Sequence, residues 1–214
     1  MSKVALIAGA SGLIGSYLLP QLLDDDHYHQ ILVIGRRPPS LLHQKQRVLI
    51  SDLSDIALSL AGHRVDDVYC ALGTTIAKAG TAAEFARVDR DAVLHLAVAA
   101  QQAQCQQMLV VSAIGANRRS LSFYSRTKGQ MEEALKALGL PCLHVFQPSL
   151  LLGQRPEKRR AEELGQKLSP LLSPLLCGPL TRYQPVAAST VASAMHKAAA
   201  RNQRGLYIHR MPFD

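Results

Sequence analysis

The sequence predicts an α/β fold of the Rossmann type: a doubly wound, mainly parallel sheet in three layers. Two observations point to it. Short apolar runs typical of buried strands alternate along the chain with longer segments that have the apolar spacing of helices. The first run, residues 3–8, leads directly into a glycine-rich turn and then into a helical pattern, an arrangement that favours phosphate binding.

The turn has the spacing G-x-x-G-x-x-G over residues 9–15, rather than the commoner G-x-G-x-x-G. We expect Gly9 to reverse the chain out of the strand, Gly12 to let backbone approach a pyrophosphate, and Gly15 to let the helix pack close to the strand. The N–H groups and positive dipole end of the helix would then hold phosphate. Pro20 is expected to kink this helix or end it early.

The second predicted strand, residues 31–34, ends in two arginines, Arg36 and Arg37. An NAD site usually has an acidic side chain near this point, where it binds ribose hydroxyls. Two guanidiniums suit a 2′-phosphate instead, so the sequence favours NADP(H) over NAD(H). The acidic and histidine-rich residues 24–29, which precede the strand, have no partner cluster and predict a solvated connection, with no metal site.

The third predicted strand, residues 48–50, is followed by Asp52. Its carboxylate could cap the next helix or accept a hydrogen bond from the adenine amino group, and the sequence leaves both open. The fourth strand, 68–72, ends in small residues at 73–75, which would let a bound cofactor lie over the strand end.

The alternating pattern continues to the end of the chain. We expect helices at 84–104, 123–138 and 190–200, and strands at 108–111, 142–146 and 206–209. From 154 to 182 a basic stretch and closely spaced prolines predict an irregular lid over the strand ends; a membrane-surface segment is the alternative. We therefore expect residues 1–214 to form a single NAD(P)-binding Rossmann domain, of which about 150–185 are a substrate-side lid.

The composition, 48% apolar and 19% charged, is that of a globular chain. No apolar run approaches the roughly 20 residues of a membrane span. The first strand begins almost at once, so we expect no signal peptide and a cytoplasmic location, with the four scattered cysteines reduced. The net charge of +8 fits nucleic acid or an anionic cofactor, but the basic clusters lack interleaved aromatics, so we expect no nucleic-acid partner.

Three residues could carry chemistry. Ser112 ends the fifth strand, and Tyr124 and Lys128 lie four apart on the next helix, so they share a face. A lysine ammonium beside a phenol favours the phenolate, and such a tyrosine can exchange a proton with a carbonyl or hydroxyl while hydride moves to or from nicotinamide. Ser112 would hydrogen-bond the same substrate oxygen, and Lys128 could also hold the nicotinamide ribose. An ordinary helix-surface pair is the alternative.

In order and spacing, these motifs resemble an atypical short-chain dehydrogenase/reductase, especially the Tat-interacting-protein group of NADP-binding, oxidoreductase-like proteins. The likeness is carried by Gly-Ala-Ser-Gly-x-x-Gly at 9–15, Gly-Arg-Arg at 35–37, Ala-Leu-Gly-Thr-Thr at 71–75, Val-Asp-Arg-Asp at 88–91, Val-Ser-Ala at 111–113 and Tyr124-x-x-x-Lys128. Two positions depart from the related extended enzymes: Asp89 stands where Asn is common, and Gln147 where Arg commonly precedes a proline.

The resemblance implies a site for an NADPH-type cofactor and for catalysis. Its expected members are Gly9, Ser11, Gly12, Leu13, Ile14 and Gly15 at the phosphates, Arg36 and Arg37 at the 2′-phosphate, Asp52 and Leu53 at adenine, Ala71, Leu72 and Gly73 at the adenosine and pyrophosphate side, Pro148 near the nicotinamide carboxamide, and Ser112, Tyr124 and Lys128 as the active group.

The leading hypothesis is an NADP(H)-dependent oxidoreductase that acts on a small carbonyl or hydroxyl substrate. The alternative is an NADP(H)-sensing regulator or scaffold without turnover, which signals through residues 154–182. A weaker alternative is an enzyme that modifies nucleotide sugars, against which the short substrate-side segment counts. A homodimer or a protein partner is left open.

Overall fold

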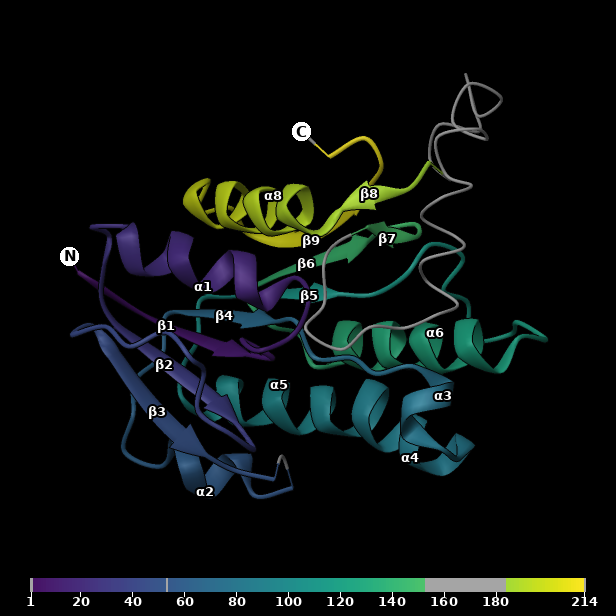
Figure 1. The fold of residues 1–214 in the computed structure, drawn as a ribbon, viewed down its shortest axis with the longest axis horizontal. Helices are drawn as coiled ribbons and strands as arrows, with labels where there is room; N and C mark the ends of the chain where they lie inside the picture. Colours follow the sequence, from purple (N-terminus) through teal and green to yellow (C-terminus); the bar gives the residue numbers. More distant parts are fainter. Residues whose placement is uncertain (1, 53, 153–183, 214) are drawn as a thin grey trace.

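Seven parallel strands form one sheet in a computed structural model that describes residues 2–52, 54–152 and 184–213 (Figure 1). The strand order is β3-β2-β1-β4-β5-β6-β9. The strands are β1 (Lys3–Ala8), β2 (Tyr28–Gly35), β3 (Gln46–Ile50), β4 (Asp67–Cys70), β5 (Gln107–Val111), β6 (Cys142–Gln147) and β9 (Gly205–Arg210). The order reverses between β1 and β4, and in such sheets ligands bind at the carboxyl ends of the strands beside this switch point. The predicted Rossmann-type fold class is confirmed.

Helices cover both faces of the sheet (Figure 1). The helices α1 (Gly15–Asp24) and α8 (Ala188–Ala200) pack on one face, and α2 (Ile56–Leu60), α5 (Ala92–Gln102) and α6 (Phe123–Ala137) on the other. Successive side chains of a strand point to opposite faces. Leu6 therefore lies in the core under α5 and α6, whereas its neighbour Ile7 lies in the core under α1 and α8.

The segment predicted as a lid, residues 154–182, lies outside the described residues, as does Leu53. On either side of it, β7 (Leu151–Leu152) and β8 (Val186–Ala187) pair in a small parallel sheet. Among the helices that the structure describes, none is long and apolar enough to cross a membrane.

The long helix expected at 84–104 is divided by a π-helical turn. The short helix α4 (Ala82–Ala86), which follows α3 (Ile76–Ala79), continues into the π-helical turn η1 (Arg87–Asp91) and then into α5. A π turn contains one more residue per turn than an α-helix, so it changes which side chains face the core. In this turn the carboxylate of Asp89 points inward and is buried.

The helix α1 continues through Pro20 to Asp24, so the expectation that Pro20 ends it early is wrong. A proline inside a helix removes one hydrogen bond, here to the carbonyl four residues earlier. The apolar side chains around it compensate, because Leu18, Leu19 and Leu22 are buried between the sheet and α8.

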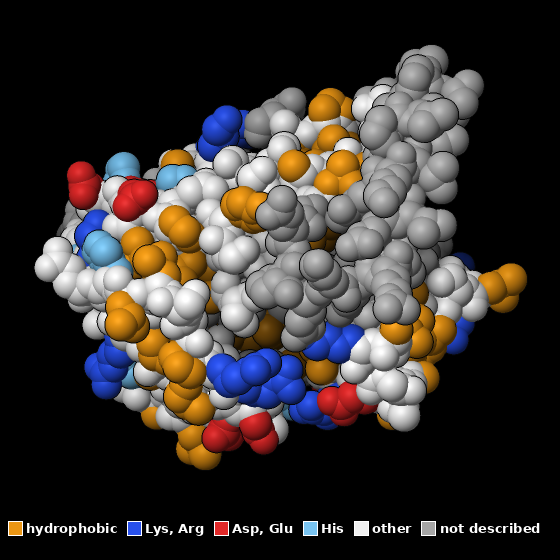
Figure 2. All heavy atoms as spheres, viewed as in Figure 1, with side chains coloured by type: hydrophobic (Ala, Val, Ile, Leu, Met, Phe, Trp, Pro, Cys, Tyr) orange, Lys and Arg blue, Asp and Glu red, His pale blue; other side chains and the backbone are white. Residues whose placement is uncertain are grey.

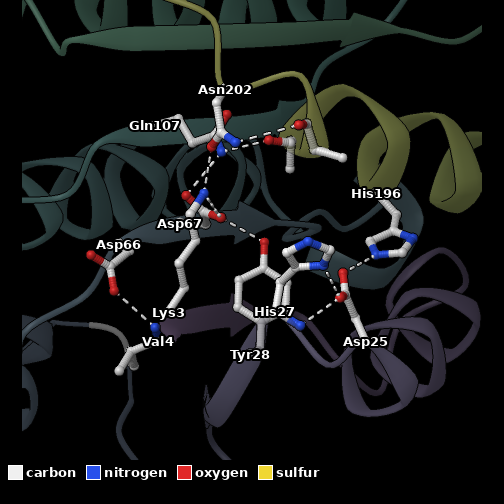
Figure 3. Close-up of polar contacts among 12 residues, drawn as sticks. Lys3, Val4, Asp25, His27, Tyr28, Asp66, Asp67, Gln107, His196 and Asn202 are labelled. Carbon is white, nitrogen blue, oxygen red and sulfur yellow. Dashed lines mark hydrogen bonds and ion pairs between the residues drawn. The ribbon is translucent and has the colours of Figure 1, made fainter. Parts of the chain in front are cut away.

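Residues 24–29 were expected to form a solvated connection, and this expectation is wrong for Asp25 and Tyr28 (Figure 3). The carboxylate of Asp25 accepts hydrogen bonds from His27 and His196, each over 2.7 Å, which ties the start of β2 to α8. Tyr28 is buried and donates its hydroxyl to Asp67 over 2.6 Å. The strand β2 begins at Tyr28, three residues before its apolar run. The network therefore lies at the amino ends of the strands, whereas ligands bind at their carboxyl ends beside the switch point.

Candidate functional site

The glycine turn is pressed between the end of β4 and the start of α1. Gly9 has a φ of +87°, and a Cβ there would lie 2.5 Å from the carbonyl oxygen of Ala71. A Cβ on Gly15 would lie 2.1 Å from the carbonyl oxygen of Gly9. Only glycine fits at either position. The expected turn and close packing are both present, while contact of this turn with a cofactor stays a prediction.

The start of α1 lies at the carboxyl end of the sheet, directly after the glycine turn. Ile14 occupies the N-cap position and supplies no side-chain hydrogen bond. Ser11 and Leu13 lie in the same turn, and the N–H of Ala71 donates to the carbonyl of Ala8 over 2.9 Å. The predicted phosphate turn and the predicted cofactor residues Ala71, Leu72 and Gly73 are therefore neighbours, beside a helix start that favours negative charge.

Arg36 and Arg37 are exposed directly after β2, beside the end of β1. Figure 2 shows Lys and Arg side chains gathered where β1 and β2 end in the view of Figure 1. The neighbouring carboxylate of Glu84 is bound by Arg87 over 2.6 and 2.8 Å. The hydrogen bond from Arg87 lowers the pKa of Glu84, and the charge of Arg36 adds to this effect. This end of the site is therefore a cluster of opposite charges with three exposed guanidiniums, those of Arg36, Arg37 and Arg87.

Asp52 does not cap the following helix. Its carboxylate accepts from the backbone N–H of Ser54 over 2.8 Å and from the Ser54 hydroxyl, whereas the N-cap of α2 is Asp55. Of the two roles that the sequence left open, helix capping is wrong, and adenine contact stays a prediction.

The predicted pair Tyr124 and Lys128 lies on the inner side of α6, which starts at the N-cap Ser122. Tyr124 is 36% exposed, and its ring lies 5.6 Å from that of the buried Phe85 in α4. Lys128 is buried one turn further on. The helix thus presents an accessible phenol next to an inaccessible ammonium.

Lys128 forms an ion pair with Asp89, and both side chains are at most 4% exposed. The distance from Lys128 Nζ to Asp89 Oδ1 is 2.8 Å, and Asp89 Oδ2 accepts from the backbone N–H of Thr74 over 2.7 Å. Burial is the largest effect on the pKa of Lys128 and lowers it, but Asp89 and then Tyr124 outweigh burial, so the pKa is raised overall. The lysine is therefore held as an ammonium.

Ser112 lies directly after β5, and its hydroxyl donates to the carboxylate of Glu132 over 2.5 Å. Gln147 donates to both oxygens of the same carboxylate over 2.9 and 3.1 Å, and Arg210 donates to Gln147 over 2.9 Å. A serine hydroxyl has a single proton. In this arrangement the hydroxyl proton of Ser112 is donated to Glu132, and the Ser112 oxygen can accept a hydrogen bond from a substrate hydroxyl.

The loops after β5 and β6 are joined, since the N–H of Ile114 donates to the carbonyl of Pro148 over 2.8 Å. Pro148 is buried at the same sheet end as Ser112. Within the described ranges, no group of three or more His, Cys, Asp or Glu side chains could hold a metal ion.

Sequence reasoning missed the partners of the predicted residues. Glu132 lies four residues beyond Lys128, and this spacing on one helix face was a usable signal. Asp89 was recognised as a departure, but its ion pair was not foreseen, because the π turn that aims it inward was not predicted. Nothing in the local sequence indicates that Phe85 contacts Tyr124.

The sequence of the chain is similar to a known family and to known proteins. The profile of a family described as NAD(P)H-binding matches residues 9–170. Protein HTATIP2 of Rattus norvegicus is 36% identical over 172 residues, which are 78% of this chain and 70% of that protein. The mitochondrial protein fmp52 of Emericella nidulans is 35% identical over 173 residues, or 78% of this chain and 74% of that protein.

Solved structures share the fold at low identity. WbmH of Bordetella bronchiseptica in complex with NAD+ has a TM-score of 0.75 at 15% identity, covering 100% of this chain and 77% of that one. MoeE5 in complex with UDP-glucose and NAD has a TM-score of 0.73 at 20% identity, covering 96% and 74%. The family profile and the two relatives show that the chain belongs to the NAD(P)H-binding family, among the atypical short-chain dehydrogenase/reductase-like proteins that include HTATIP2 and fmp52. The glycine turn and the strand order agree with this assignment.

Proposed function

We propose that this protein is an NADP(H)-dependent oxidoreductase that acts on a small carbonyl or hydroxyl substrate. The observation that carries the proposal is the placement of Tyr124. Its phenol is accessible, it lies one helical turn from a buried ammonium, and that ammonium is linked through Asp89 to the loop beside the glycine turn. An acid–base group next to a cofactor site is what carbonyl reduction requires.

Each residue then has a distinct role. A bound nicotinamide cofactor supplies or accepts the hydride. The Tyr124 hydroxyl donates its proton to the substrate oxygen during reduction, and the Lys128 ammonium favours this by stabilising the phenolate. Lys128 would hold the ribose hydroxyls once the cofactor reaches its ammonium, which is buried and paired with Asp89 in this structure. Ser112 donates its own proton in a hydrogen bond to Glu132, so its oxygen accepts a hydrogen bond from the hydroxyl form of the substrate.

The preference for NADP(H) is supported by the chemistry at the end of β2. Arg36 and Arg37 are exposed there, and a guanidinium offers a planar set of donors that matches a phosphate. The structures of WbmH and MoeE5 contain NAD. Because they are only 15% and 20% identical to this chain, the likeness shows the shared fold and does not decide between NAD and NADP.

Titration calorimetry with NADPH and with NADH tests this preference. We expect NADPH to bind more tightly, and the double variant Arg36→Ala/Arg37→Ala to lose about tenfold or more in NADPH affinity, as expected for lost charge-assisted hydrogen bonds. Its affinity for NADH should change little. Arg118→Ala/Arg119→Ala, a second pair of adjacent exposed arginines, is the matched control. Equal losses in the two double variants would contradict a 2′-phosphate site.

Turnover is tested with a panel of small aldehydes and ketones, by following the consumption of NADPH. For any substrate found, Tyr124→Phe should lower the rate about 10²- to 10⁴-fold, the usual contribution of one acid–base group. NADPH affinity should stay unchanged, because the ring and its contact with Phe85 remain. A Tyr124→Phe protein that reduces the substrate at the wild-type rate would refute the mechanism.

A specific observation favours a second function, an NADP(H)-sensing regulator. Lys128 and Ser112 are each bound to a buried carboxylate, Asp89 and Glu132, which limits how freely they can serve a substrate. Tight NADPH binding with no turnover of the carbonyl panel would favour this function. A cytoplasmic location stays a prediction, and cell fractionation would test it.

A further inference from the structure

A cavity of about 360 Å³ lies beside α6, on a different face of that helix from the predicted catalytic pair. Its walls come from the loop after β5, from α6 and from the ends of β6 and β9. Gly129, Glu133 and Lys136 line it, and the helical period places them on another face than Tyr124 and Lys128. The volume is that of a small-molecule site, so the cavity can hold a ligand separately from the cofactor.

The sheet leaves this space open at its edge. The last strand is β9, and its side chains alternate, so Leu206, Ile208 and Arg210 share one face. Their neighbours on β6, Leu143 and Val145, are buried in the core under α6. Leu206 and Ile208 instead remain 48% and 40% exposed. Among the described elements, α6 is therefore the last cover on this face, and the cavity lies beyond it.

The loop after β5 is held against α6 by a close approach at Gly129. A Cβ there would lie 2.2 Å from the backbone nitrogen of Arg118 and from the carbonyl carbon of Asn117. The N–H of Asn117 also donates to the carbonyl of Ser125 over 3.0 Å. Glycine at position 129 thus lets the loop bring Arg118 and Arg119 to the wall of the cavity.

Arg210 on β9 is oriented by a buried side chain. Its Nε donates to the side-chain oxygen of Gln147 over 2.9 Å, and the amide nitrogen of Gln147 donates to Glu132. Gln147 and Glu132 are at most 5% exposed. An arginine at position 147, which is common in the related enzymes, could not accept from Arg210, because a guanidinium has no acceptor. Glutamine at this position therefore fixes one edge of the Arg210 guanidinium at the cavity.

The cavity carries more positive than negative charge. Lys136 and Glu133 pair with each other over 3.0 Å. The pKa of Glu133 is lowered chiefly by Lys136, and a smaller effect of Arg118 shows that this guanidinium lies near the same rim. Arg118, Arg119 and Arg210 form no ion pair with any residue that the structure describes. The walls thus hold three guanidiniums whose charge no ion pair neutralises.

We propose that this cavity binds a small, doubly charged oxyanion, the group that phosphate monoesters and dicarboxylates share. The three guanidiniums face one further carboxylate, Glu132, whose oxygens already accept from Ser112 and Gln147. Two positive charges are left for the ligand. A guanidinium presents a planar fork of N–H donors that matches phosphate and carboxylate alike. This site is separate from the proposed cofactor site and does not rest on the NADP(H) function.

NMR titration of the ¹⁵N-labelled protein measures the binding of inorganic phosphate and, separately, of malonate, each at constant ionic strength. The backbone amide signals of Arg118, Arg119 and Arg210 should shift together and saturate with one dissociation constant for at least one probe. Saturation with phosphate alone assigns the site to phosphate monoesters, and saturation with malonate alone assigns it to dicarboxylates. If neither probe saturates these signals, the proposal is overturned.

Two matched double variants separate this site from general attraction to a basic chain. Arg118→Ala/Arg119→Ala should weaken the binding of the effective probe about tenfold or more, as expected for lost charge-assisted hydrogen bonds. Arg36→Ala/Arg37→Ala removes two exposed charges at the end of β2 and should leave that binding unchanged. Equal weakening in both would mean that the net charge of +8 alone attracts the probe, and the proposal would fail.

NADPH separates the two sites in the wild type. Saturating NADPH should leave the dissociation constant of the probe unchanged, because neither the glycine turn nor Arg36 and Arg37 line the cavity. Displacement of the probe by NADPH would place the probe in the cofactor site and would overturn the proposal. A wild type that binds the probe but no NADPH supports the cavity site and contradicts the proposed function, so the two failures are distinguishable.

Discussion

Replacing Asp25 by Asn should remove a pH-dependent part of the stability of the fold. The carboxyl is 13% exposed and links the α1–β2 connection to α8 through His196 (Figure 3). Burial is the largest effect on its pKa and raises it. Hydrogen bonds from His196 and from the backbone and ring of His27 outweigh burial, so the pKa falls from 3.8 to about 2.

The size of the effect follows from this shift. A difference of one in pKa corresponds to about 1.4 kcal/mol, so the native contacts of ionised Asp25 contribute about 2 kcal/mol. The native state binds the proton more weakly than the unfolded state does. The contribution is therefore complete above about pH 5 and is lost as the pH falls towards 2, where both states become protonated.

Urea unfolding of the wild type and of Asp25→Asn, at several pH values between about 2 and 5, measures this contribution. We expect a difference of about 2 kcal/mol in the free energy of unfolding at pH 5, shrinking steadily at lower pH. Asp26→Asn is the control: Asp26 is fully exposed, 3.7 Å from Lys45, and its loss should change stability by less than about 1 kcal/mol. A difference for Asp25→Asn that stays constant with pH would refute the reasoning.

Two further substitutions test the packing of the site. Gly15→Ala should lower the free energy of unfolding by about 1–3 kcal/mol, because its Cβ would meet the Gly9 carbonyl at 2.1 Å. Gly35→Ala, whose Cβ would lie 3.8 Å from its nearest neighbour, should change it little; equal effects in urea unfolding would contradict the close approach. Glu132→Gln should lower the free energy of unfolding by about 1 kcal/mol, since the amide keeps one oxygen for Ser112 and Gln147 but replaces the second acceptor of Gln147 by an NH2 group; unchanged thermal and urea unfolding would count against the network.

The sheet could be predicted because its signals are local. Buried parallel strands are continuous apolar runs, and the turn after β1 needs glycine at positions where a Cβ has no room. Strand ends that consist of polar residues were harder to predict. The strand β2 begins at Tyr28, whose hydroxyl bonds with Asp67 and with the Tyr69 hydroxyl, both on β4, and no local pattern contains these contacts.

The candidate site could be predicted in part for the same reason. Tyr124 and Lys128 follow from a spacing of four on one helix. The partner of Lys128 does not, because periodicity assumes 3.6 residues per turn, and η1 departs from it at Asp89. The partner of Ser112 depends on how α6 packs against β5 and β6, which is a tertiary contact.

The two buried carboxylates decide which proposed function the site can perform. Asp89 keeps Lys128 charged, which helps Tyr124 release its proton, yet it also neutralises part of the field that the phenol experiences. Glu132 turns Ser112 into an acceptor, which suits a hydroxyl substrate better than a carbonyl. An enzyme with this site should therefore hold an alcohol well and depend on Tyr124 alone to donate a proton to a carbonyl. A sensor needs only to bind the cofactor. Measuring NADPH binding and turnover on the same variants separates the two, because Tyr124→Phe affects only turnover, whereas Arg36→Ala/Arg37→Ala affects binding.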